Sequence, residues 1–254
     1  MFIISNLYNF ITVFTLFFML AGPALSMPLA RVFSKKLALR WANYVTHTMA
    51  HKIFNFMHVY MRINYSFDKK SKSMLPEQFI LISNHQSLTD IPVYMNYFPE
   101  KEIRFVAKDA LGKNIPLISD ILRVQKHCLI PRSGGASIAM KTLSKFGKQV
   151  MENNQIPVIF PEGTRSKDGQ LGKFYSAGFR MISDSTHLPV AVCVLDEGYK
   201  VNDLKHIWEN LKNINYKVKI LKVFDPPKNK EEQIKILDES HQLMQAQLEE
   251  WHKK

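Results

Sequence analysis

The sequence has few cysteines. Only Cys128 and Cys193 occur among its 254 residues, which excludes a secreted disulfide framework and any cysteine-rich zinc site. It also contains no internal repeat and no low-complexity linker. Apolar residues make up 46% and charged residues 22% of the chain, so it has enough apolar side chains for a core and is not disordered as a whole.

Acidic residues are missing from the first quarter of the chain. None precedes Asp68, whereas six basic residues do, so half of the net charge of +12 lies there. An anionic partner is therefore expected: a phosphorylated small molecule, an acidic membrane surface or a nucleic acid. A nucleic acid is disfavoured, because no recognition motif is present and the densest basic region adjoins an apolar run.

The chain opens with an uncharged segment. Residues 2–30 carry no charge, and Phe2–Leu25 is mostly aromatic and aliphatic. About twenty such residues, at roughly 1.5 Å each, can cross a hydrocarbon core of about 30 Å. No basic residue precedes the run, which disfavours a secretory signal, although small residues near Ala24 leave cleavage open.

The residues after this run predict its end and its orientation. Pro23 and Pro28 are expected to end it, and they would also let it bend back within one leaflet. If the segment spans a membrane, Arg31 and the basic residues that follow should face the cytoplasm. The sequence thus predicts a membrane anchor but leaves open whether it crosses the bilayer.

The next segment, residues 36–65, predicts an amphipathic helix with one apolar and one basic, histidine-rich face. The apolar face comprises Leu37, Trp41, Val45, Met49, Ile53, Met57 and Tyr60. Such a helix suits an anionic membrane surface, and it can also dock on its own domain. His47 and His51 have the spacing of a metal-binding pair, but no third ligand is placed beside them, so no metal site is expected.

From Phe79 onward, short apolar runs alternate with helical patterns. The predicted strands are Phe79–Ser83, Ile103–Ala107, Cys128–Ile130, Pro157–Phe160, Leu188–Leu195 and Tyr216–Phe224. The predicted helices are Ile91–Tyr97, Ile115–Leu122, Ala136–Met151, Phe174–Ser183 and Glu231–Trp251. This order indicates an α/β fold, a mixed open sheet flanked by helices. We divide the chain into a helical membrane-anchoring segment, 1–66, and a domain, 67–254.

Polar clusters follow two of the predicted strands, where ligands bind in open α/β sheets. The first, residues 84–90 (NHQSLTD), contains His85 and Asp90. A carboxylate bonded to one imidazole nitrogen fixes the tautomer and makes the other nitrogen a better base. The chain has no Gly-x-Ser-x-Gly motif and no cysteine in a recognisable catalytic setting. A His/Asp pair without a protein nucleophile indicates activation of a hydroxyl that belongs to the substrate, but the spacing taken alone fits a surface turn better than a catalytic pair.

The second cluster, residues 160–166 (FPEGTRS), supplies Glu162, Gly163, Thr164 and Arg165. An arginine can hold phosphate oxygens in a two-pronged geometry, and a glycine lets main-chain amides approach a ligand. Taken alone, this stretch fits a turn in which the glutamate pairs with the arginine better than it fits a binding site.

Together the two clusters resemble those of the glycerolipid acyltransferase family, in particular its 1-acyl-sn-glycerol-3-phosphate acyltransferases. Residues 84–90 look like the His-x4-Asp block and residues 160–166 like the Pro-Glu-Gly-Thr-Arg block. Residues 128–132 (CLIPR) and 188–194 (LPVAVCV) resemble its two looser blocks, with departures at Pro131, where an acidic residue is common, and at Val192, where a proline is usual.

The resemblance implies an active site. His85 would be the general base held by Asp90, Arg132 and Arg165 would hold a phosphate, and Glu162, Gly163 and Thr164 would complete the binding site. Lys108 is a weaker phosphate candidate, since lysines are mostly solvated at surfaces.

The implied reaction moves an acyl group from acyl-CoA or acyl-carrier protein to lysophosphatidate, at an anionic membrane and on its cytoplasmic face. No metal or cofactor is expected, because a thioester is already activated. Two alternatives remain at this point: a related acyltransferase that acts on glycerol-3-phosphate or another lysophospholipid, and a non-catalytic protein that binds anionic membranes.

Overall fold

The computed structural model describes residues 2–61, 63–131, 133–202, 210 and 214–253. Its described strands form one seven-stranded sheet in the order β1-β7-β6-β2-β5-β3-β4. The strands are β1 (Asn64–Phe67), β2 (Ile80–Ser83), β3 (Ile103–Lys108), β4 (Cys128–Ile130), β5 (Ile156–Ile159), β6 (Val190–Asp196) and β7 (Asn215–Phe224). The sequence predicted six of them and missed β1.

The sheet is mixed, as predicted. Strands β6, β2, β5, β3 and β4 run parallel to one another, whereas β7 runs antiparallel to β6 and β1 parallel to β7. The carboxyl ends of β6, β2 and β5 therefore lie side by side at one edge of the sheet. The two predicted polar clusters follow β2 and β5 at this edge.

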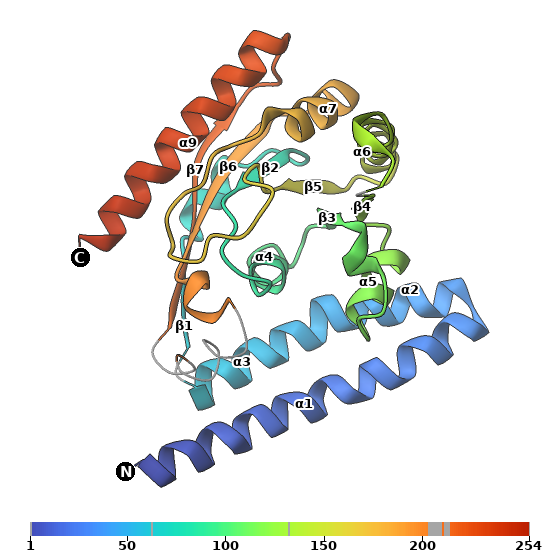
Figure 1. Ribbon diagram of the computed structural model, residues 1–254, viewed down its shortest axis with the longest axis vertical. Helices are drawn as coiled ribbons and strands as arrows, with labels where there is room; N and C mark the ends of the chain where they lie inside the picture. Colours follow the sequence, from blue (N-terminus) through green and yellow to red (C-terminus); the bar gives the residue numbers. More distant parts are fainter. Residues whose placement is uncertain (1, 62, 132, 203–209, 211–213, 254) are drawn as a thin grey trace.

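Helices cover both faces of the sheet (Figure 1). On one face lies α4 (Asp90–Tyr97); on the other lie α6 (Gly135–Glu152), α7 (Ser176–Thr186) and α9 (Lys230–His252). Because side chains alternate along a strand, β2 and β5 contribute one set of apolar residues to each of two cores. The central strands are buried on both faces, as parallel strands between helices are.

The first helix, α1 (Phe2–Phe33), is longer than predicted. The expectation that Pro23 and Pro28 end it is wrong, because both lie inside the helix. Each proline removes one main-chain hydrogen bond. Met27, between them, is fully buried with Ala42 and Leu117, so tertiary packing holds the helix where the local sequence disfavours it.

The predicted helix over 36–65 is interrupted and shorter. It consists of α2 (Lys35–Asn43), a π-helical segment (Tyr44–Met49) and α3 (Ala50–Met61). Tyr65, predicted to be helical, lies in β1 instead. The wider π-helical turn changes which residues face inward. Part of the predicted apolar face is therefore exposed, including Leu37 and Tyr60, whereas Ala38, Ala42, Val45 and Phe54 are buried.

These helices pack against α5 (Ile118–Val124) at one end of the molecule (Figure 1). The Arg31 guanidinium of α1 forms an ion pair with Asp120 of α5. Just beyond α5, the Gln125 amide donates to Asn43 Oδ1 and to Thr46 Oγ1, each at 2.9 Å. The N-terminal segment thus docks on its own domain, which was one of the two roles that its pattern allowed.

Candidate functional site

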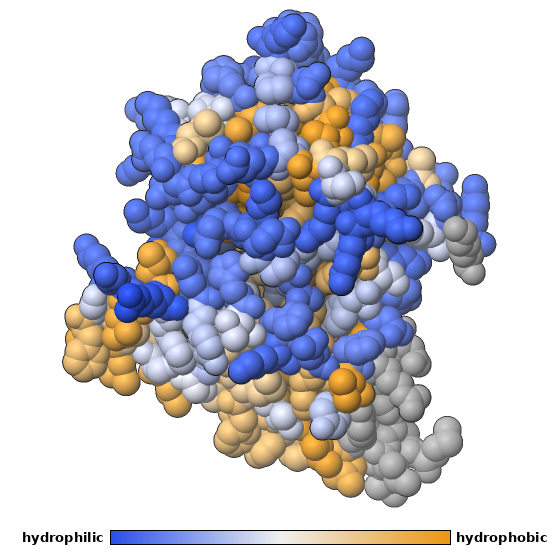
Figure 2. Space-filling model, turned by 180° about the vertical axis from the view of Figure 1, so that it is seen from behind, coloured by the Kyte–Doolittle hydropathy of each residue, from blue (hydrophilic) through white to orange (hydrophobic). Residues whose placement is uncertain are grey.

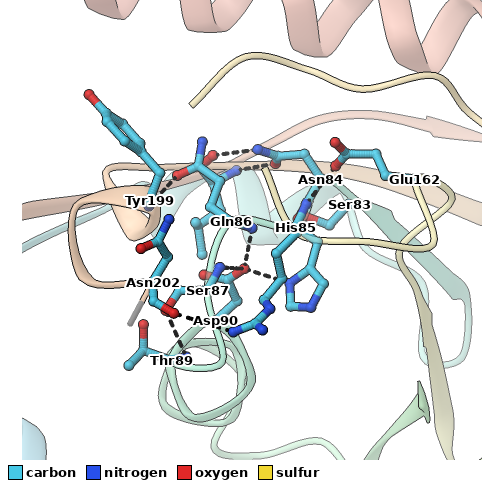
Figure 3. A network of polar contacts seen from close by, with 12 residues as sticks. Ser83, Asn84, His85, Gln86, Ser87, Thr89, Asp90, Glu162, Tyr199 and Asn202 are labelled. Atoms are coloured by element: carbon cyan, nitrogen blue, oxygen red, sulfur yellow. Dashed lines mark hydrogen bonds and ion pairs between the residues drawn. The ribbon is translucent and has the colours of Figure 1, made fainter. Parts of the chain in front are cut away.

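The site lies where β2, β5 and β6 end (Figure 3). Directly after β2, the buried Asn84 side chain forms two hydrogen bonds to the main chain of Leu195 in β6, one as donor and one as acceptor, both at 2.8 Å. This paired contact replaces the sheet hydrogen bonds that end with the strand. It fixes the direction in which the chain leaves the sheet toward His85.

Asp90 is the first residue of α4 and is completely buried. Its Oδ2 atom accepts three hydrogen bonds: from His85 Nδ1 at 2.8 Å, from Gln86 N–H at 2.7 Å and from Ser87 N–H at 2.8 Å. Three donors and the amino-terminal end of a helix stabilise the negative charge of this carboxylate. The predicted approach of His85 and Asp90 is thus observed (Figure 3).

This contact determines which nitrogen of His85 is free to react. A carboxylate accepts from Nδ1–H, so the neutral ring carries its lone pair on Nε2. The His85 side chain is 16% exposed, so the ring can be reached from outside. Among the described residues, none forms a hydrogen bond with Nε2.

Glu162 connects the two polar clusters. Its Oε1 accepts from His85 N–H at 2.7 Å and its Oε2 from Gly172 N–H at 2.9 Å. Burial raises the pKa of the Glu162 carboxyl, against the lowering effect of these two bonds. Because both oxygens are bound to main-chain amides, the carboxylate holds together the loops that follow β2 and β5.

The next three residues, Gly163, Thr164 and Arg165, are exposed. Gly163 has a φ of 65° and closes a tight turn by donating its N–H to Phe160 O at 3.1 Å. Ser166 N–H donates to His85 O at 2.8 Å, which brings the Arg165 segment against the histidine. The Arg165 guanidinium donates to Asn202 O at 3.3 Å.

The remaining predicted residues are less closely placed. Lys108 is exposed and ends β3, which β5 separates from β2. Arg132 lies outside the described residues. Both cysteines are buried, and burial raises the pKa of each thiol to about 12, so neither has the thiolate character of a nucleophile.

Within the described part of the chain, no three His, Cys, Asp or Glu side chains are grouped to hold a metal ion. His51 Nδ1 is hydrogen-bonded to Asn96 Oδ1 at 2.8 Å, and His47 lies 3.6 Å from a carboxylate oxygen of Glu102.

Sequence reasoning missed Gly198. A Cβ atom at this position would lie 2.6 Å from Asp90 Oδ1 and 3.2 Å from Gln86 Cβ, so the backbone that follows β6 approaches the site too closely for a side chain. This constraint follows from the position of the buried Asp90 in the folded protein. A glycine in a loop does not indicate it in the sequence.

Comparison with known proteins shows related sequences and a related fold. A family model described as Acyltransferase matches residues 62–195. A 1-acyl-sn-glycerol-3-phosphate acyltransferase of Cocos nucifera is 35% identical over 46% of this chain and 36% of its own length. One of Helicobacter pylori is 32% identical over 50% of this chain and 52% of its own length. The chain thus spans about half or less of the length of these curated relatives.

A solved structure, the 1-acyl-sn-glycerophosphate acyltransferase PlsC of Thermotoga maritima, shares the fold. Its TM-score is 0.66, with 20% sequence identity over 99% of this chain and 96% of that one. The family match covers more than half of the chain and includes both polar clusters, at 84–90 and 160–166. The chain therefore belongs to the acyltransferase family.

Proposed function

We propose that this protein is a 1-acyl-sn-glycerol-3-phosphate O-acyltransferase, which transfers a fatty acyl group to the sn-2 hydroxyl of lysophosphatidate and forms phosphatidate for phospholipid biosynthesis. The contact between His85 and the buried Asp90 carries the proposal, because it creates a general base, and among the described residues no serine, threonine or cysteine side chain is hydrogen-bonded to the His85 ring. The names of the curated relatives support lysophosphatidate as the acceptor.

In the proposed reaction, His85 Nε2 takes the proton of the acceptor hydroxyl while the hydroxyl oxygen attacks the carbonyl carbon of the acyl thioester. Asp90 holds the ring and stabilises the imidazolium that forms. The tetrahedral intermediate then collapses, the carbon–sulfur bond breaks, and the leaving thiolate takes the proton from Nε2. Proton transfer of this kind contributes on the order of 10²- to 10⁴-fold to a rate.

The rest of the acceleration must come from positioning and from stabilising the oxyanion. Arg165 would bind the acceptor phosphate with Arg132, and Lys108 would add charge at the same edge of the sheet. Main-chain amides at the turn after Glu162 would face the oxyanion. The Gly163 N–H already bonds to Phe160 O, whereas those of Thr164 and Arg165 have no partner among the described residues.

Membrane attachment fits these substrates, and α1 supports it. Its segment Val13–Phe33 is long and apolar enough to cross a membrane. The mean hydropathy of this segment is 1.8, and only 17% of its most apolar stretch is buried. Apolar surface gathers at the end of the molecule formed by the N-terminal helices (Figure 2). Val32 is 84% exposed and Phe33 79% exposed, close to the exposed Lys35 and Lys36.

We therefore propose that this end docks on an anionic leaflet at the cytoplasmic face. The donor is proposed to be acyl-CoA or acyl-carrier protein, with no further cofactor, since the thioester supplies the activated acyl group.

A product assay tests the proposal. Purified protein is incubated with lysophosphatidate and acyl-CoA or acyl-carrier protein, and phosphatidate is measured by mass spectrometry, with glycerol-3-phosphate and other lysophospholipids as competing acceptors. His85→Ala should abolish transfer and leave binding to anionic vesicles intact. The control is His187→Asn. His187 is exposed and has a left-handed backbone conformation, which asparagine adopts readily, so this variant should change neither acyl transfer nor vesicle binding. Vesicle binding without acyl transfer to any acceptor would instead favour a non-catalytic membrane protein.

A further inference from the structure

We infer that Phe160 is a positioning residue for His85. The two rings stack with their centroids 4.2 Å apart and their planes 13° from parallel. This inference rests on the proposed function, in which His85 is the base.

The sequence places the Phe160 ring on the side of the sheet where α4 lies. Phe160 directly follows β5, and its side chain continues the alternation of Ile156 and Val158, which belong to the same core as the α4 residues. Pro161 comes next, and a residue before proline is restricted to extended backbone conformations. The ring is therefore carried past the end of the strand without losing the strand's orientation.

Further rings support Phe160 from behind. Phe105 in β3 lies 6.1 Å from Phe160 with planes 11° apart, and His127 lies 5.8 Å from Phe105 with planes 9° apart. Phe105 is fully buried and His127 nearly so. Four nearly parallel rings thus form a column that runs from the protein interior to His85. The column gives Phe160 little freedom to tilt.

The His85 ring needs such a support. Its one hydrogen bond, from Nδ1 to Asp90, fixes the position of that nitrogen but does not prevent the ring from rotating about the hydrogen bond. Contact with a flat ring fixes the plane, and therefore the direction of the Nε2 lone pair. An aromatic face also attracts the positive charge that the imidazole acquires during the reaction. Asp90 and Phe160 together thus hold His85 in one orientation, and small errors in such orientation are costly in rate.

Ordinary core packing offers a different account of the same contact. Phe160 belongs to the edge of a large aromatic core that also holds Tyr94 and Phe98, with Tyr94 6.3 Å from Phe160. On that account, loss of its ring would lower stability as loss of another core ring does, with no particular effect on His85. A test must therefore compare Phe160 with a buried ring that does not touch the histidine.

Nuclear magnetic resonance tests the stack without relying on activity. Protein labelled with ¹³C-histidine contains nine histidines, and His85→Gln assigns the signal of interest. Stacking should shift the carbon-bound ring protons of His85 upfield from their positions in the urea-unfolded chain. Phe160→Leu should remove this shift and Phe160→Tyr should keep it. An unshifted His85 signal in the folded wild-type protein overturns the inference, even if neither Phe160 variant folds.

Kinetics then tests the consequence. Phe160→Leu should lower kcat about tenfold and leave KM for lysophosphatidate within about twofold, whereas Phe160→Tyr should retain most of kcat. The matched control is Phe98→Leu, which removes a fully buried ring without contact to His85 and should leave kcat near that of wild type. Equal losses in Phe160→Leu and Phe98→Leu, or a loss confined to KM, contradict the inference. A wild-type protein without acyl transfer overturns the proposed function, while the histidine signal still decides the stack.

Discussion

Glu162 accepts a hydrogen bond from the main-chain N–H of His85 at 2.7 Å, across a separation of 77 residues. With its second oxygen on Gly172 N–H, this one carboxylate determines the path of the chain after both β2 and β5. Glu162 is 4% exposed. The two loops that carry the proposed base and the proposed phosphate-binding arginine therefore share a buried, charged connection.

We expect Glu162→Gln to lower kcat by about 10- to 100-fold. The glutamine retains one acceptor oxygen but turns an NH₂ group toward the second main-chain N–H, which leaves two donors facing each other and the His85 backbone less constrained. Steady-state kinetics at pH 7 would measure the effect. Glu152→Gln, at the exposed end of α6, is the matched control and should change kcat little. An equal response of the two variants would contradict a role for this connection.

Wild type and Glu162→Gln should also differ in how their free energy of unfolding depends on pH. Because burial raises the pKa of the Glu162 carboxyl above its ordinary value of 4.5, the folded state holds this proton more tightly than the unfolded state. The contribution of Glu162 to the free energy of unfolding should therefore be largest below pH 4.5 and decline as the pH rises through the raised pKa. Urea unfolding of wild type and Glu162→Gln between pH 4 and pH 8 should show their difference falling with pH. A difference that grows with pH would show the opposite shift.

Asp90→Asn should lower kcat by about 10³-fold or more. The amide can keep a hydrogen bond to His85, but it carries no charge to stabilise the imidazolium and permits the other tautomer, in which Nε2 is protonated and cannot act as a base. Turnover and vesicle binding would be measured together, and binding should persist. Asp238→Asn, on the exposed side of α9, should behave like wild type. A similar kcat for all three proteins would remove Asp90 from the mechanism.

The sequence predicts the central elements of this fold well, because their residues repeat with the period of the structure they form. The prediction fails where tertiary packing, and not the local sequence, determines the structure. Four-residue β1 has no alternation long enough to be recognised, and its partner β7 lies about 150 residues later in the chain. The prolines of α1 predict an end that the buried Met27 prevents.

In the candidate site, too, some contacts could be predicted from the sequence and others could not. His85 and Asp90 are close in sequence and follow a predicted strand, so their approach could be predicted once the second cluster was considered with them, although the spacing alone also fitted a surface turn. The role of Glu162 could not, because its partners His85 and Gly172 are main-chain groups, and any residue type could supply their N–H. Neither the stacking of Phe160 nor the steric demand at Gly198 has a local pattern, since each depends on how β5 and β6 lie beside β2.

Gly198→Ala should impair catalysis through Asp90. The added methyl group would lie 2.6 Å from Asp90 Oδ1, closer than the packing allows, so the carboxylate or its helix must move. Overpacking of this kind costs about 1–3 kcal/mol of stability, and we expect kcat to fall about tenfold or more. Gly178→Ala is the control, because a Cβ atom there meets nothing within 4 Å inside α7. It should stabilise the protein by about 0.5–1 kcal/mol without changing kcat. Equal kcat values for both variants would show that Asp90 tolerates displacement.

His127 should make the protein sensitive to acid. Burial, and the nearby charge of Arg104, lower the pKa of His127 from 6.5 to about 3. Its Nδ1 accepts the N–H of Phe105 at 2.9 Å and its Nε2 lies 3.2 Å from Gln125 Oε1, and Gln125 in turn binds the N-terminal helices. The neutral ring thus completes a buried chain of hydrogen bonds, and a proton on Nδ1 would break it.

Between pH 6.5 and about 3, the unfolded chain binds a proton at His127 and the folded protein does not. The free energy of unfolding should therefore fall as the pH falls, by up to about 1.4 kcal/mol per pH unit from this group. His127→Asn keeps an acceptor for Phe105 N–H but does not titrate, so it should lose less stability than wild type over this interval. The exposed His187→Asn should follow wild type. Parallel urea-unfolding curves for wild type and His127→Asn from pH 7 to pH 4 would show that this histidine does not limit acid stability.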